Sequence, residues 1–132
     1  MATFKWDHIH LRSPDPEATA AFYERMFGAE VIRTAQQGKT RIDLKIGGGS
    51  VFIAPVTPGD GVASPPKTPY QGLDHFGLEV TGIDAVVADL KKKGAEFTME
   101  PNNIRPGVRI AFLRGPEGVS IEIGRASCRE RV

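Results

Sequence analysis

One short pattern occurs twice in this chain. The stretch DHIHL at residues 7–11 is echoed by DHFGL at residues 74–78, and GAEV at residues 28–31 is echoed by GAEF at residues 94–97. Two passages repeated in the same order, at nearly the same offset, predict two copies of one supersecondary unit. Since neither copy alone can cover the apolar face of its sheet, we expect the two copies to act together.

Candidate metal ligands fall at equivalent points of the two copies. His8 corresponds to His75, and alignment of the short apolar strands that end the copies pairs Ile53 with Glu122. Two imidazoles and one carboxylate form a donor set that divalent metals use. Where a fourth ligand would be expected, this alignment places Ile53, which cannot bind a metal.

Each copy predicts a strand, a helix and three further strands. Asp15 and Gly28 are typical start and stop signals for the first helix. The spacing of Ala18, Phe22 and Met26 indicates the face of that helix that packs on a sheet. The predicted strands cover residues 4–11, 30–35, 40–46, 50–54, 73–80, 95–99, 108–113 and 119–124, and the second helix runs from about residue 83 to residue 93. The expected fold class is α+β, with two βαβββ modules forming a concave mixed β-sheet cleft.

The domain organisation follows from these elements. We expect a single domain over residues 1–124, with one module over 1–55, a linker over 56–72 that is rich in Pro, Gly, Ser and Thr, and a second module over 73–124. The polar tail 125–132 continues neither pattern and is interpreted as frayed or foreign to the natural protein, with no function.

Composition excludes several function classes. The formal charge of +1 over 132 residues gives no reason to expect a nucleic-acid or membrane partner. No apolar run approaches the roughly 20 residues that cross a membrane, and the first residues do not resemble a signal peptide. The single cysteine, Cys128, has no partner for a disulfide within the chain. A cytoplasmic protein is therefore predicted.

Strand alternation directs the candidate ligands to one face. If the apolar residues of each first strand and of the last strand face the helices, His8, His75 and Glu122 face the concave side. His10 and Glu79 share that side. The alternative interpretation is that a histidine between apolar residues is an ordinary core side chain.

The chain resembles the vicinal oxygen chelate superfamily, the glyoxalase/bleomycin resistance protein/dioxygenase family. The stretches that carry the resemblance are residues 7–11, 13–15, 22–23, 27–28, 74–80, 112–113, 115–118 and 121–123. They cover nearly all of the chain before the tail. The resemblance implies that His8, His75 and Glu122 hold a divalent ion (Fe, Mn, Zn or Ni) that binds two adjacent oxygens of a small substrate and acts as a Lewis acid.

The resemblance leaves three functions open. Glyoxalase I and methylmalonyl-CoA epimerase use a Glu or Gln at the position assigned to Ile53, so its absence slightly favours dioxygenase-type chemistry. The alternative enzyme is a glyoxalase I-like lyase or epimerase in which Glu122, His10 or Glu79 moves a proton. Residues 103–107 lack the serine-bearing loop expected of fosfomycin-resistance enzymes. The third possibility is a metal-free, drug-binding protein of the bleomycin-resistance type.

Charged and aromatic residues suggest a substrate site and a partner. Arg41 and Arg109 are expected in the cleft, where they suit a carboxylate or phosphate, or else they pair with Asp43 and Glu79. The aromatic residues Phe4, Trp6 and Tyr70 either form a wall of that cleft or pack in a core. Exposed sheet edges and the resemblance predict a homodimer, and the two modules are expected to pair either within one chain or by exchange between two chains.

Overall fold

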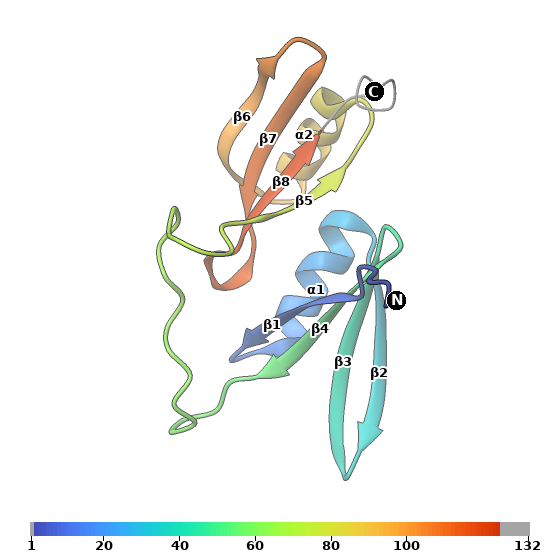
Figure 1. Cartoon of the computed structure of the whole chain (residues 1–132), viewed down its shortest axis with the longest axis vertical. Helices are drawn as coiled ribbons and strands as arrows, with labels where there is room; N and C mark the ends of the chain where they lie inside the picture. Colours follow the sequence, from blue (N-terminus) through green and yellow to red (C-terminus); the bar gives the residue numbers. More distant parts are fainter. Residues whose placement is uncertain (1, 125–132) are drawn as a thin grey trace. The chain divides into compact units, whose positions relative to one another are not determined.

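The computed structural model describes residues 2–124. The chain divides into two compact units, Met1–Ala63 and Ser64–Val132. Each unit contains one four-stranded sheet and one α-helix (Figure 1). This arrangement confirms the α+β class and the two βαβββ modules. The tail 125–132, for which the sequence predicts no function, lies outside the described residues.

The two units have the same element order and the same sheet topology. The first contains β1 (His8–Ser13), α1 (Pro16–Phe27), β2 (Glu30–Gln36), β3 (Lys39–Ile46) and β4 (Gly49–Pro55). The second contains β5 (Phe76–Glu79), α2 (Ile83–Lys92), β6 (Glu96–Arg105), β7 (Val108–Arg114), a 3₁₀ turn (Pro116–Gly118) and β8 (Ser120–Gly124). The strand orders are β1-β4-β3-β2 and β5-β8-β7-β6, and only the β1–β4 and β5–β8 pairs are parallel.

The first helix starts and ends where its capping residues predict. The Asp15 carboxylate accepts a hydrogen bond from the Ala18 backbone N–H at 3.1 Å, and Gly28 ends the helix at φ 69°. Of the predicted stripe, Met26 is buried and Phe22 half-buried, whereas Ala18 is exposed. The helix packs on its sheet through Tyr23 and Met26. The three-residue step between these buried positions keeps them on one helical face.

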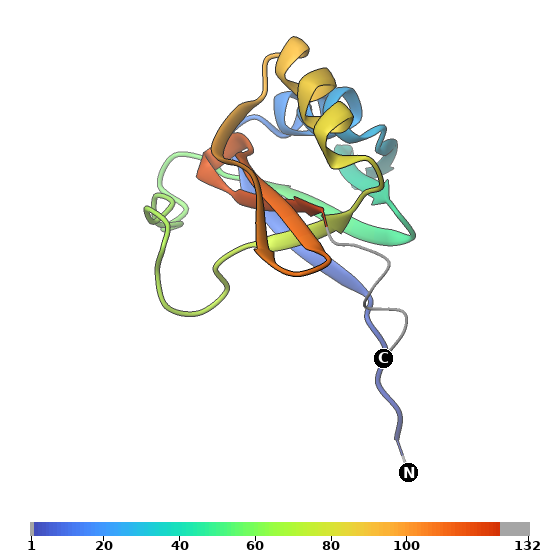
Figure 2. The same cartoon turned by 90° about the horizontal axis from the view of Figure 1, so that it is seen from above.

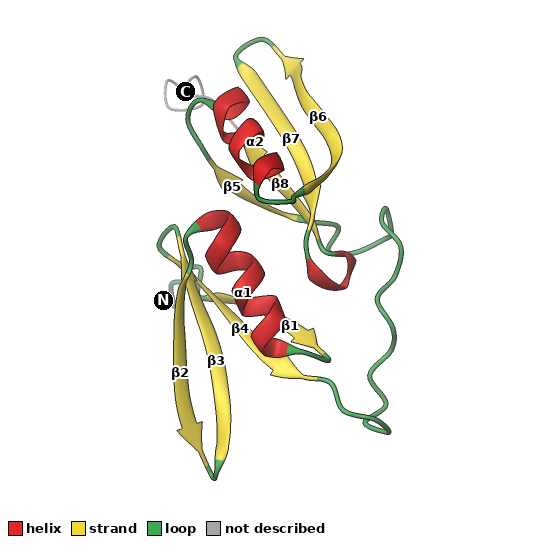
Figure 3. Ribbon diagram, turned by 180° about the vertical axis from the view of Figure 1, so that it is seen from behind, coloured by secondary structure: helices red, strands yellow, loops and turns green. Residues whose placement is uncertain are grey.

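The second helix buries the residues that its periodicity predicts. Ile83, Val87 and Leu90 are buried, and the helix contacts β6 and β7. Figure 3 shows each helix lying over the sheet of its own unit. Alternation along the strands then sends one set of side chains towards that helix and the other set to the opposite face. On β8, Ile121 and Ile123 are fully buried, so Glu122 between them points away from α2.

Two predicted strands are shorter than expected. β1 begins at His8 because its pairing with β4 begins there, opposite Ser50. The preceding segment extends away from the sheet (Figure 2), and its side chains Phe4 and Trp6 are 95% and 79% exposed. β5 likewise begins at Phe76.

Among residues 2–124, no helix is long and apolar enough to cross a membrane.

Candidate functional site

The second unit brings a histidine and a carboxylate together from two strands. His75 directly precedes β5, and Glu122 lies on the parallel neighbour β8. The Nε2 atom of His75 lies 3.0 Å from Oε1 of Glu122, and its Nδ1 atom lies 2.8 Å from a carboxylate oxygen of Asp74. Phe112 packs edge-on against the imidazole at 4.9 Å between ring centroids. Both ring nitrogens of His75 therefore face carboxylates.

These carboxylates raise the pKa of His75. The hydrogen bond to Asp74 raises the pKa of His75 above its ordinary value, partial burial opposes this, and Glu122 adds to the increase. A protonated imidazole can donate to Asp74 and Glu122 at once. A divalent cation can replace the Nε2 proton, because the same two atoms, Nε2 and Oε1, are typical metal ligands.

The first unit repeats only half of this arrangement. The Nδ1 atom of His8 lies 2.7 Å from a carboxylate oxygen of Asp7, as His75 does with Asp74. On its other side, His8 stacks on the ring of Phe52, with centroids 4.1 Å apart and planes 27° apart. The histidine–aspartate pair is thus duplicated, whereas the histidine–glutamate pair is not.

The strand register corrects the expected counterpart of Glu122. His10 lies opposite Phe52 in the β1–β4 pair, and Gly77, the counterpart of His10, lies opposite Glu122 in the β5–β8 pair. Phe52, not Ile53, therefore occupies the position equivalent to Glu122. Ile53 is 4% exposed, in the core of the first unit. The sequence alignment was one residue off because the hairpin leading into β8 is one residue longer. Eight residues separate Asp43 from its partner Phe52, and nine separate Phe112 from its partner Glu122.

Charged groups surround Phe52 on the same face. The Arg41 guanidinium carbon lies 4.8 Å from the Phe52 centroid, and its Nε donates to both carboxylate oxygens of Asp43 at 3.0 and 3.1 Å. The Arg41–Asp43 pairing is one of the two alternatives predicted for this arginine. Partial burial lowers the pKa of His10, as do Arg12, His8 and Arg41, while Asp43 opposes the shift, so the neutral form of His10 is favoured.

Arg109 does not lie in the cleft position predicted for it. Its guanidinium donates to the Asp84 carboxylate in the first turn of α2 at 2.9 and 3.1 Å, with a further contact of 3.4 Å to Asn103. The predictions that it faces away from the helix, or pairs with Glu79, are wrong. Ala111 and Leu113 lie opposite Ile123 and Ile121 on the helix-facing side of the sheet, and alternation along β7 puts Arg109 on that same side. The prediction failed because it took Ile110 as the helix-facing residue.

The aromatic residues and Glu79 are exposed. Phe4, Trp6 and Tyr70 are 95%, 79% and 40% exposed, so they are not core residues. Glu79 is exposed at the end of β5.

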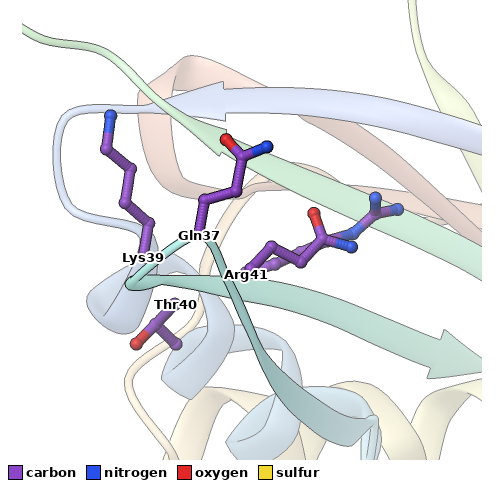
Figure 4. A pocket seen from close by; sticks show the side chains of 5 residues that line it. Gln37, Lys39, Thr40 and Arg41 are labelled. Atoms are coloured by element: carbon purple, nitrogen blue, oxygen red, sulfur yellow. The ribbon is translucent and has the colours of Figure 1, made fainter.

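A pocket lies at the β2–β3 hairpin (Figure 4), and its lining residues are Gln36, Gln37, Lys39, Thr40 and Arg41.

The predicted ligands belong to different units. His75 and Glu122 are brought together in the second unit, and His8 belongs to the first. Taken singly, neither unit gathers three His, Cys, Asp or Glu side chains suited to a metal within residues 2–124. The three-ligand set therefore stays a prediction.

Sequence reasoning assigned no role to Asp7 and Asp74. The signal was present, since an aspartate directly precedes each repeated histidine. Metal-binding histidines commonly donate their second ring N–H to a carboxylate, which fixes the ring and its tautomer. Phe52 could not be found in this way, because its role depends on the strand register.

Comparisons with known proteins agree with this fold. The family model described as Glyoxalase/Bleomycin resistance protein/Dioxygenase superfamily matches residues 5–123. Lactoylglutathione lyase GLX1 of Arabidopsis thaliana is 27% identical over 124 residues, which cover 88% of this chain and 42% of the plant protein. The mitochondrial methylmalonyl-CoA epimerase of Homo sapiens is 29% identical over 128 residues, covering 91% of this chain and 73% of the epimerase. This chain thus spans less than half the length of the plant lyase.

A solved structure gives the same result for the fold. The fosfomycin resistance protein FosX from Listeria monocytogenes superimposes with a TM-score of 0.76, covering 99% of this chain and 100% of that chain. The two sequences are 19% identical, so this similarity concerns the fold alone.

Proposed function

The chain belongs to the Glyoxalase/Bleomycin resistance protein/Dioxygenase superfamily, and from this membership we propose that it is a metal-dependent enzyme acting on a small substrate with two adjacent oxygens. We propose His8, His75 and Glu122 as the protein ligands of one divalent ion. The single observation that carries the proposal is the contact of 3.0 Å between His75 Nε2 and Glu122 Oε1.

The donor set fits a divalent ion. The Nε2 atom of His75 and a carboxylate oxygen of Glu122 lie close enough together to bind one ion. Asp74 contacts the other ring nitrogen of His75, as carboxylates next to metal sites commonly do with metal-binding histidines. The Asp7–His8 pair supports His8 as the further ligand, because it repeats the Asp74–His75 geometry. When bound, the ion would supply Lewis-acid polarisation of the substrate oxygens. The residue types suit Fe, Mn, Zn and Ni alike.

The residue at the fourth-ligand position supports dioxygenase-type chemistry. Phe52 occupies the position equivalent to Glu122 and offers no lone pair. A site with three protein ligands retains open positions for a chelating substrate and one more ligand. Catechols are therefore the first substrates to test.

A second candidate function is supported by the curated relatives. Proteins named lactoylglutathione lyase and methylmalonyl-CoA epimerase are 27% and 29% identical to this chain. Both names describe reactions that move a proton. In this chain His10 is one candidate base, because its lowered pKa favours the neutral imidazole, which can accept a proton. Glu79 and Glu122 are the other candidates.

Metal reconstitution followed by substrate tests separates the candidates. The protein is stripped with a chelator, its metal content is measured, and Fe(II), Mn(II), Zn(II) or Ni(II) is added back. Oxygen uptake with catechol supports the dioxygenase, whereas turnover of methylglyoxal with glutathione supports the lyase, and the His75→Gln variant serves as the inactive control. A wild-type protein that binds none of these metals contradicts the proposal and leaves a metal-free binding protein.

We also propose a homodimer in the cytoplasm. Each four-stranded sheet has an edge strand at either side within its own unit, β1 and β2 in the first and β5 and β6 in the second, and edge strands are common sites of pairing between chains. Light scattering coupled to size exclusion tests the dimer, and a mass of one chain at micromolar concentration would contradict it.

A further inference from the structure

Phe52 and Glu122 occupy equivalent positions in the two half-sites but differ in chemistry. The units share topology, the register of their parallel strand pair and the aspartate–histidine pair, yet Glu122 touches the histidine in one unit and Phe52 touches it in the other. At this position the two half-sites therefore differ in what touches the histidine, a phenyl ring in one and a carboxylate in the other. A phenyl ring in contact with a candidate ligand suggests a role for that ring.

The contacts of Phe52 are those expected of a ring that holds the His8 imidazole by stacking. The nearly parallel rings of His8 and Phe52 lie 4.1 Å apart at their centroids, and His10 meets Phe52 edge-on at 6.5 Å. The guanidinium of Arg41 lies 4.8 Å from the Phe52 centroid and is itself fixed by Asp43. Aromatic stacking and cation–π attraction both restrict such a ring to a few orientations.

We propose that Phe52 is a positioning residue: it fixes the His8 imidazole by stacking and, because it offers no lone pair, keeps the proposed ion at three protein ligands. The inference rests on the proposed function. In the second unit His75 is held between two carboxylates, one of which is itself a proposed ligand. In the first unit Asp7 and Phe52 hold His8 without adding a ligand.

The first test needs no metal. The chain contains three histidines, so their imidazole proton signals are assignable by NMR with His10→Gln and His75→Gln variants. Stacking on Phe52 shifts the His8 ring protons through the ring current. We expect this shift to disappear in Phe52→Leu and to remain in Phe97→Leu, a matched control in which a half-buried ring also lies near a cation, Lys91.

The second test measures metal affinity. We expect Phe52→Leu to bind Mn(II) or Zn(II) roughly three- to tenfold more weakly than wild type, as the loss of one aromatic pair implies. Phe97→Leu should bind as wild type does. Phe52→Glu places a carboxylate where Glu122 stands in the other unit, and we expect it to bind at least about tenfold more tightly than Phe52→Leu.

The outcomes separate this inference from the proposed function. Wild-type metal binding that is unchanged in Phe52→Leu, or an unchanged His8 signal in that variant, overturns the positioning role alone. If Phe52→Glu binds no more tightly than Phe52→Leu, Phe52 does not occupy a ligand position. A wild-type protein that binds no metal overturns both proposals, whatever the NMR signals report.

Discussion

The Nε2 atom of His75 and the Oε1 atom of Glu122 lie 3.0 Å apart although 47 positions separate the two residues in sequence. Parallel pairing of β5 with β8 produces this contact, because it sets Gly77, two residues after His75, opposite Glu122. The contact depends on strand pairing within one unit. It is therefore the firmest part of the candidate site.

Removal of the Glu122 carboxylate should impair metal binding. We expect Glu122→Ala to weaken binding by about 100-fold or more, since loss of outer-sphere partners alone costs 10–100-fold. Isothermal titration with Zn(II) measures the effect. The control is Glu100→Ala, whose carboxylate pairs with Lys91 at the surface. Equal affinities in the two variants would exclude Glu122 as a ligand.

The two aspartates that precede the histidines should contribute equally to metal affinity. Asp7 and Asp74 each accept from the Nδ1 atom of a neighbouring histidine, at 2.7 and 2.8 Å. We expect Asp7→Asn and Asp74→Asn each to lower metal affinity by about 10- to 100-fold. Asp89→Asn, which alters a surface pair with Lys93, is the matched control. A loss seen only in Asp74→Asn would remove His8 from the proposed ligand set.

The Asp84–Arg109 ion pair predicts a pH dependence of stability. Hydrogen bonds from Arg109 lower the pKa of Asp84 in the folded protein. A carboxyl group with a depressed folded pKa stabilises the fold above its unfolded pKa, and the contribution is lost as pH falls through the folded pKa. In urea unfolding, the wild type should therefore have a higher free energy of unfolding than Asp84→Asn at pH 7. This difference should shrink below about pH 3.9.

Arg109→Gln provides the check on this pair. It removes the partner that lowers the pKa of Asp84, so it should lose the same pH-dependent part of the free energy of unfolding. A gap between wild type and Asp84→Asn that is constant with pH would contradict the pairing.

Gly124 should tolerate no side chain. Its φ is 136°, and an added Cβ would collide with the carbonyl oxygen of Arg109 and lie 2.8 Å from the Cα of Ile110. We expect Gly124→Ala to lower the free energy of unfolding by about 3 kcal/mol or more. Gly118→Ala, at φ 75° with open space around its Cβ, isolates the backbone cost and should lose only about 1–2 kcal/mol. Equal losses of unfolding free energy in the two variants would contradict the collision expected at Gly124.

Local signals predicted the elements, because local physics decides them. The Asp15 and Gly28 caps and the Ile83, Val87 and Leu90 spacing depend on residues within a few turns of one another. The start of β1 could not be predicted in this way. Alternation continues through Phe4 and Trp6, but a strand requires a partner, and pairing with β4 starts only at His8.

The site was predicted in its residue types but not in its register. Alternation correctly directed Glu122 away from the helix, and the contact with His75 follows from that. The one-residue difference in turn length is invisible to an alignment anchored on glycines, so Ile53 was assigned the place of Phe52. Arg109 was misplaced because both Ile110 and Ala111 are apolar, and the sequence does not tell which of them faces the helix; pairing with β8 shows that it is Ala111.

Metal stoichiometry and affinity in His8→Gln and His75→Gln test the central claim most directly. Each variant removes a proposed ligand from a different unit. If one ion is held by both units, the wild-type protein binds one equivalent of metal, and the two variants lose affinity to a similar extent. If His75→Gln abolishes binding while His8→Gln binds as the wild type does, the proposed three-ligand site is wrong.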